Sequence, residues 1–96
     1  MISYIKGKII DISGGSLLVE AGGIGYRIYV CESVLGSARE GEISQFFLYS
    51  SFSMYEGFKF YGFKDKKQME IFELLLNSIP NTGAKKALEY LNKILK

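Results

Sequence analysis

The hydrophobic pattern of this 96-residue chain changes its period once, close to residue 63. Before that point, apolar and polar residues alternate in short runs separated by glycine pairs, which is typical of β-strands. After it, apolar residues recur every three or four positions, which is typical of helices with one buried face. A chain of this length builds one domain, or a small domain with an appendage. We therefore predict an α+β chain with two parts, residues 1–63 and residues 64–96.

The first part predicts five short strands. We expect them at residues 2–12, 17–21, 24–31, 43–52 and 58–63, with an irregular stretch at 32–41 that has room for one short helical turn. Glycine pairs break the first three strands, and residues 53–57 form the tip of the last hairpin. Five antiparallel strands in about 60 residues match a small Greek-key barrel such as the OB-fold. An SH3-like barrel fits the strand count almost as well, so the spacing leaves both open.

The second part predicts two helices joined by a short turn. Asp65 and Gln68 have the spacing of a capping box, in which Asp65 caps the first helix and the Gln68 side chain reaches back. The buried faces are formed by apolar residues at helical spacing, namely Met69, Phe72, Leu75, Leu76 and Ile79, then Ala84, Ala87, Leu88, Leu91, Ile94 and Leu95. The second helix has no stop signal before Lys96, which suggests either a very short protein or part of a longer one.

Composition argues against an enzyme. The chain has no histidine and one cysteine, so it offers no Ser–His or Cys–His pair and no zinc cluster. The glycines at residues 22–25 precede a predicted strand rather than a helix, and the P-loop signature is absent. Glu40 and Glu42 flank a predicted turn, where solvated charge is the ordinary explanation. We expect no catalytic residue, no metal and no cofactor.

The chain also has no features of a membrane or secreted protein. No apolar run reaches the ~20 residues that a membrane-spanning helix needs, and the N-terminus lacks the layout of a signal peptide. The single cysteine, Cys31, excludes an internal disulfide and suits a reducing compartment. Because it follows Val30 in a strand pattern, we expect a buried, unreactive thiol. These features predict a cytoplasmic protein without a membrane partner.

Charge is distributed unevenly along the chain. Residues 1–63 contain five basic and six acidic side chains, whereas residues 64–96 contain seven lysines and four acidic side chains. Phosphate-binding surfaces are electropositive, so the last third is the better candidate for contacts with nucleic acid. An ordinary set of solvated lysines would give the same numbers.

The turn between the two predicted helices is the strongest candidate for a binding site. It begins at Pro80, and two lysines follow it in the first turn of the second helix. A helix N-terminus presents unpaired amides and partial positive charge to a phosphate. In a helix-hairpin-helix, glycines in such a turn allow positive φ and let the phosphate approach the backbone. We predict DNA-phosphate contacts, with a plain connector as the alternative, at Asn81, Thr82, Gly83, Lys85 and Lys86.

A second candidate lies at the tip of the last predicted hairpin, at Tyr55 and Glu56. A carboxylate there would repel phosphates and steer DNA strands apart, although a lone exposed glutamate is usually only solvated. The neighbouring strands are rich in aromatic side chains, which either stack on single-stranded bases or fill the core. These are Phe46, Phe47, Tyr49, Phe52, Phe58, Phe60, Tyr61 and Phe63.

Several segments, taken in order, resemble the start of the RuvA family. They are Met1-Ile2, Lys6-Gly7-Lys8-Ile9, Val19 to Tyr26, Phe60-Tyr61-Gly62-Phe63 and Leu75 to Leu88. RuvA is the Holliday-junction-binding subunit of the bacterial RuvAB branch-migration complex. The resemblance implies an OB-fold followed by a first helix-hairpin-helix. It also implies a homotetramer whose flat platform holds the arms of four-way junction DNA by their phosphates, without reading sequence.

The resemblance assigns roles to both candidate sites. In the family, two acidic residues at the hairpin tip act as a central pin that separates strands. These positions fall on Tyr55 and Glu56, and only Glu56 keeps the charge. The family's helical turn usually reads Gly-x-Gly-Pro-Lys. Asn81 and Ala84 depart from it, which implies weaker phosphate binding.

The family's second helix-hairpin-helix and its domain for the motor subunit RuvB have no counterpart in the 96 residues, so we expect no motor activation by this chain alone. The resemblance implies a non-enzymatic subunit that acts with RuvB in branch migration, recombination and repair. Two other functions stay open. One is an oligomerisation module without measurable DNA binding, and the other is an OB-fold protein that binds single strands through its aromatics.

Overall fold

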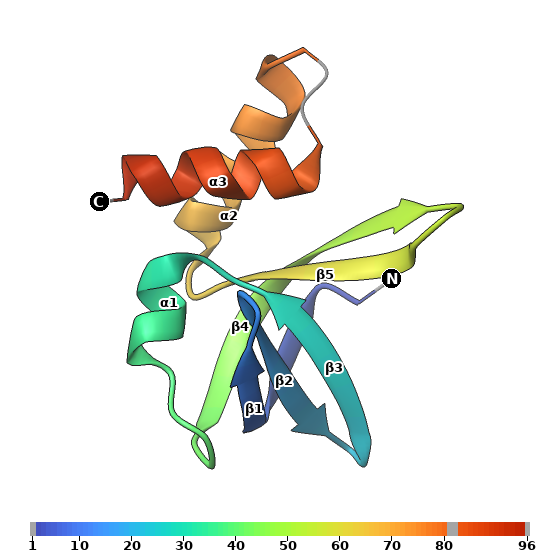
Figure 1. The fold of residues 1–96 in the computed structure, drawn as a ribbon, viewed down its shortest axis with the longest axis vertical. Coiled ribbons are helices and arrows are strands. Elements are labelled where there is room, and N and C mark those ends of the chain that lie inside the picture. Colours follow the sequence, from blue (N-terminus) through green and yellow to red (C-terminus); the bar gives the residue numbers. More distant parts are fainter. Residues whose placement is uncertain (1, 81–82, 96) are drawn as a thin grey trace.

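The five predicted strands form a closed barrel with helices beside it in the computed structural model, which describes residues 2–80 and 83–95 (Figure 1). In chain order, the elements are β1 (Tyr4–Ser13), β2 (Ser16–Ala21), β3 (Ile24–Tyr29), α1 (Glu32–Ser37), β4 (Ile43–Ser53), β5 (Gly57–Phe63), α2 (Lys66–Ser78) and α3 (Ala84–Ile94). The predicted strand boundaries differ from these by no more than two residues. The irregular stretch after β3 contains the short helix α1.

The strand order around the barrel is β1-β2-β3-β5-β4, and β4 returns to β1. Four of the five strand pairs are antiparallel. The prediction of an all-antiparallel barrel is wrong for β3 and β5, which run parallel and pair Ile28 with Phe60 and Tyr29 with Tyr61. Parallel strands need a crossover, which α1 and β4 provide here. This order, with a helix between β3 and β4, is that of the OB-fold and decides against the SH3-like barrel.

Two glycines lie where neighbouring strands of the barrel approach too closely for a side chain. A Cβ added at Gly7 would lie 2.9 Å from Val19 Cγ1 and still closer to the carbonyl oxygen of Glu20. A Cβ at Gly62 would lie 2.5 Å from Ile28 Cγ2. Real Cβ atoms do not approach other atoms so closely, so both positions require glycine for space rather than for an unusual φ.

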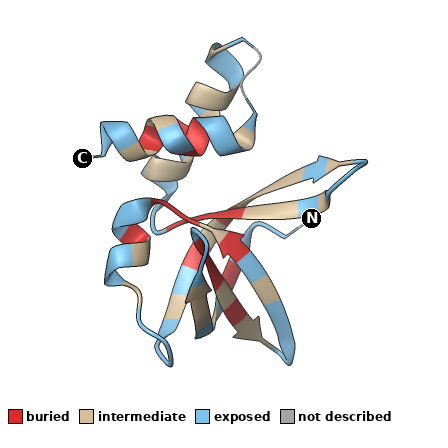
Figure 2. Cartoon of the chain, viewed as in Figure 1, coloured by how far each residue is buried: buried red, intermediate tan, exposed pale blue. Residues whose placement is uncertain are grey.

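The apolar interior has two clusters, and buried segments lie along the barrel strands and the middle of α3 (Figure 2). The first cluster fills the barrel. The second lies between the barrel and the helices, with Phe72 of α2 at its centre. The Phe72 ring lies 5.3, 5.7 and 4.9 Å, between centroids, from those of Tyr49, Tyr61 and Phe63. These contacts fix α2 against β4 and β5.

The predicted buried face of α2 is buried at Phe72 and only partly buried at Met69, Leu75 and Leu76, while Ile79 lies just past the end of the helix. The side chain of Asp65 accepts a hydrogen bond from the Gln68 amide at 2.8 Å, as predicted for the N-cap of α2. The predicted reciprocal hydrogen bond from the Gln68 side chain is wrong, because its buried Oε1 has no hydrogen-bond partner among the described residues. In α3, Ile94 and Leu95 are exposed rather than buried. The last turn of α3 extends past α2, so these side chains stay in solvent (Figure 1).

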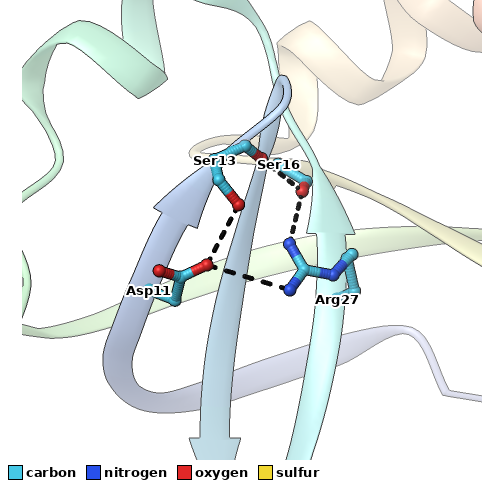
Figure 3. A network of polar contacts seen from close by, with 4 residues as sticks. All are labelled: Asp11, Ser13, Ser16 and Arg27. Carbon is cyan, nitrogen blue, oxygen red and sulfur yellow. Dashed lines mark hydrogen bonds and ion pairs between the residues drawn. The ribbon is translucent and has the colours of Figure 1, made fainter.

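A polar network joins the first three strands (Figure 3). The guanidinium of Arg27 donates to Ser16 Oγ at 2.8 Å, and Ser16 Oγ donates to the carbonyl of Ser13 at 2.8 Å. Ser13 Oγ donates to Asp11, whose carboxylate lies 3.9 Å from Arg27 Nη2. The buried Ser16 hydroxyl therefore takes part in two hydrogen bonds, as a buried polar group requires.

The division of the chain into two domains, residues 1–63 and residues 64–96, stays a prediction.

Candidate nucleic-acid interface

A groove of about 290 Å³ lies between the β4–β5 hairpin and the N-terminal end of α3. We call it the hairpin–helix groove. Glu56, Gly57 and Lys59 line it from the hairpin, and Gly83, Ala84 and Lys85 line it from the helix. The hairpin projects from the barrel on the side where α3 begins (Figure 1). Two regions that the sequence singled out separately therefore share one surface.

The N-terminus of α3 opens into this groove. Gly83 is the N-cap and provides no side-chain cap, while its carbonyl accepts the first helical hydrogen bond from Ala87 at 3.0 Å. Amides in the first turn of an α-helix have no acceptor within the helix and carry partial positive charge. No acidic side chain lies in the first turn of α3. The end of the helix is thus suited to an anion.

The reason for glycine at position 83 differs from the predicted one. Its φ is −87° and its ψ is 174°, an extended backbone that any residue adopts, so the expected positive φ is wrong here. A Cβ at Gly83 would meet nothing within 4 Å. Gly83 itself therefore places no side chain over the amides of the helix N-terminus, and this is the property that a ligand would use.

The predicted DNA-binding residues fall into three groups. Gly83 and Lys85 line the groove. Lys86 is exposed in the same helical turn but is not part of the groove lining. Asn81 and Thr82 lie outside the described residues.

The predicted hairpin tip is present where the sequence indicates. Phe52 pairs with Phe58 and Ser53 with Gly57, so residues 54–56 form the turn. Gly57 has φ of +72°, which explains its glycine. Ser53 Oγ accepts hydrogen bonds from the amides of Tyr55 at 3.1 Å and Glu56 at 3.2 Å. Both predicted pin positions are exposed, but only one is acidic.

Lys59 is a groove residue that the sequence reasoning missed. Its Nζ donates to Glu56 Oε2 at 3.1 Å, and this hydrogen bond is the main cause of the raised pKa of Lys59. The same Nζ lies 5.6 Å from the ring centroid of Tyr29. The sequence signal for this pair was that Glu56 and Lys59 have opposite charges and lie three residues apart, with the turn residue Gly57 between them. The tip glutamate is therefore paired with a cation of its own hairpin.

A second groove of about 420 Å³ shares Lys59, Tyr61 and Lys85 with the first. It continues along α3 past Leu88 to Asn92. Burial is the main cause of the raised pKa of Tyr61, which stays protonated at neutral pH. Two lysines thus border a continuous path between the barrel and α3.

The aromatic side chains divide between core and surface. Phe46, Tyr61 and Phe63 are buried, which confirms the core role for them, and Phe47, Tyr49 and Phe60 are partly buried. Within the predicted aromatic stripe, Phe52 and Phe58 are the exposed members, both next to the hairpin tip. The stripe therefore offers no continuous exposed stacking surface, and its fully exposed part is the end near the tip.

Other predicted features bear less directly on binding. Cys31 is buried as predicted, although it caps α1 instead of ending a strand. Burial, aided by the charge of Glu32, raises the pKa of its thiol to about 11.

Among the described residues, no cluster of three or more His, Cys, Asp or Glu is arranged to hold a metal ion. No helix in residues 2–80 and 83–95 is long and apolar enough to cross a membrane.

The sequence matches that of known proteins along its whole length. Residues 1–62 match the model of the RuvA N terminal domain. The chain is 41% identical over 96 residues to the Holliday junction branch migration complex subunit RuvA of Elusimicrobium minutum, covering 100% of this chain and 48% of that protein.

Two further relatives carry the same name. The protein of Caldanaerobacter subterraneus is 36% identical over 95 residues, with 98% of this chain and 50% of the relative covered. The protein of Clostridium beijerinckii is 38% identical over 94 residues, with 96% of this chain and 46% of the relative covered. The chain spans about half the length of the curated relatives it matches. By its match over residues 1–62, the chain belongs to the RuvA N-terminal domain family.

Proposed function

We propose that this chain is the junction-binding platform of a RuvA-type subunit of a Holliday junction branch migration complex. It binds four-way junction DNA through phosphates, does not read sequence and catalyses no reaction. The observation that carries this proposal is the hairpin–helix groove, which Lys59 and Lys85 line together with the N-terminus of α3.

The chemistry of the groove suits a DNA backbone. Lys85 lies in the first turn of α3, and lysines and helix N-termini are common phosphate ligands. Such contacts position a duplex without reading its bases. We assign phosphate contacts to Gly83 and Lys85, with Lys86 assisting from the same helical turn. Asn81 and Thr82, which precede Gly83 in the sequence, are assigned the same role.

The hairpin tip contributes less repulsion than a fully acidic pin. Glu56 keeps one carboxylate, whereas Tyr55 has none. Lys59 pairs with that carboxylate at 3.1 Å. A strand-separating role that depends on negative charge is therefore weakened in this chain.

Self-association is the second part of the proposal. Large apolar side chains are exposed on the barrel strands, namely Tyr4, Ile10, Ile24 and Ile43, and they supply surface for contacts between copies. We propose a homotetramer, the assembly that the family resemblance implies. Partnership with the RuvB motor is proposed for the whole protein, since the chain spans about half the length of its relatives.

A gel-shift comparison tests this function. An immobile four-way junction, a duplex and a single strand of matched length are titrated with the 96-residue chain, while light scattering gives its mass. Preference for the junction by a tetramer is the expected result. A tetramer that shifts no DNA would favour the oligomerisation module instead, and preference for the single strand would favour a single-strand-binding protein. Equal affinity for all three DNAs would contradict structure-specific binding.

A further inference from the structure

The tip of the β4–β5 hairpin carries a concentration of exposed apolar surface. Met54 is 91% exposed and Tyr55 is 99% exposed, and Phe52 and Phe58 just below them are 62% and 60% exposed. The Phe52 and Phe58 rings lie 5.0 Å apart between centroids. Single exposed apolar residues are ordinary, but four within seven residues of one projecting hairpin mark a contact surface.

The backbone of this tip is stabilised by local hydrogen bonds. The hydroxyl of Ser53 accepts hydrogen bonds from the amides of Tyr55 and Glu56, and Gly57 completes the turn with a positive φ. A turn that is already hydrogen-bonded needs less ordering of its backbone when it binds. The ring of Tyr55, which is 99% exposed, is presented to solvent from such a turn.

The charges around the tip favour a nucleic acid as the partner. Glu56 would repel phosphates, but Lys59 Nζ lies 3.1 Å from its carboxylate and offsets that charge. Lys59 and Lys85 line the adjoining hairpin–helix groove together with the N-cap of α3. Because Glu56 and Lys59 pair with each other, Lys85 and the N-terminus of α3 supply the positive charge of the groove. A positively charged groove next to an exposed aromatic ring is the combination by which proteins hold unpaired nucleotides, with the backbone in the groove and a base on the ring.

We propose that Tyr55 is a base-stacking residue for unpaired DNA nucleotides. Its ring stacks on one base, Met54 contacts the same nucleotide from the side, and the strand's phosphates lie in the hairpin–helix groove. The inference rests on the proposed function for the presence of DNA and goes beyond it. It gives the tip an attractive contact with bases, where an acidic pin acts by repelling phosphates.

Fluorescence of 2-aminopurine tests this inference, because stacking on an aromatic ring quenches it. The base is placed at the crossover of a four-way junction and, separately, within a single strand. The 96-residue chain is compared with its Y55A and Y55F variants. We expect quenching with the wild type and Y55F, and loss of quenching with Y55A, whose affinity for the single strand falls about tenfold. Circular dichroism checks that Y55A is folded, which we expect for a position that is 99% exposed.

The outcomes separate this inference from the proposed function. Junction binding with equal quenching by Y55A and wild type would overturn the stacking role and leave the proposed function standing. Quenching through Tyr55 without preference for the junction would support stacking and overturn the proposed function. Absence of binding to either DNA would overturn both. A lower molecular mass for Y55A with unchanged quenching would instead make the tip a contact between copies of the chain and would also overturn stacking.

Discussion

Lys59 Nζ lies 3.1 Å from Glu56 Oε2, and this ion pair joins strand β5 to the hairpin tip. Both residues line the groove that also contains the N-terminus of α3. The carboxylate that the family resemblance assigns to the pin is thus held by a cation that would otherwise be available to phosphate. At this hairpin, the carboxylate of Glu56 repels DNA phosphates, and the ammonium group of Lys59 attracts them.

Replacing Glu56 with Gln removes the repelling charge and releases Lys59. We expect E56Q to bind four-way junction DNA about three- to tenfold more tightly at low salt, with a steeper loss of affinity as salt is added. Fluorescence anisotropy at several salt concentrations measures both quantities. Glu70→Gln, an equal charge change at an exposed site on α2, is the matched control. Equal effects of the two variants would mean that only net charge matters.

Lys85 is expected to contribute one phosphate contact. K85A should weaken binding to junction and duplex DNA by similar factors, about three- to tenfold, and reduce the slope of affinity against salt by about one. Lys93→Ala, an exposed lysine in the last turn of the same helix, is the control. A K93A variant that loses as much affinity as K85A would place the DNA elsewhere on α3.

Gly7 is expected to tolerate no side chain. The Cβ of alanine would collide with the Glu20 carbonyl oxygen, a backbone atom that cannot rotate away. We expect G7A to lower the free energy of unfolding by about 1–3 kcal/mol, as overpacking does. In Gly36→Ala, the new Cβ meets nothing within 4 Å inside α1, so stability should stay equal or rise by about 0.5–1 kcal/mol. Urea denaturation compares the two, and equal effects would contradict the close approach at Gly7.

Burial of the Cys31 thiol predicts that the free energy of unfolding depends on pH in the alkaline range. Its thiol pKa rises from 9.0 to about 11 in the folded chain, chiefly through burial. Between these values the unfolded thiol loses its proton while the folded thiol keeps it. The contribution of Cys31 to stability is therefore constant below pH 9 and falls as the pH rises toward 11.

Cys31→Ala isolates this effect from other groups that titrate in the same range. The difference in unfolding free energy between wild type and C31A should shrink as the pH rises from 8 to 11. Thermal or urea unfolding at several pH values measures it. A constant difference would show that the folded thiol ionises normally.

The fold was accessible from the sequence because each strand is marked locally. Glycine pairs at residues 14–15 and 22–23 close the hairpins of β1, β2 and β3, and their φ values are positive as turns of this kind require. The parallel pairing of β3 with β5 was not accessible, because it joins residues about thirty positions apart and depends on the closure of the whole barrel.

The candidate site was predicted in pieces but not as a unit. The helix N-terminus at Gly83 and the tip at Glu56 each have a local signal. Their meeting in one groove depends on how Phe72 packs α2 against β4 and β5, which no local pattern encodes. The ion pair of Lys59 and Glu56 was missed for a similar reason, since the turn geometry brings the two side chains together.

Amide chemical shifts of the chain, recorded with and without a four-way junction, most directly test whether the hairpin–helix groove holds DNA. We expect the largest changes at residues 56–59 and 83–86, on the two sides of the groove, and little change around Arg27 on the barrel strand β3. Changes centred on β1, β2 and β3 with none at the α3 N-terminus would contradict the assignment of the DNA-binding surface.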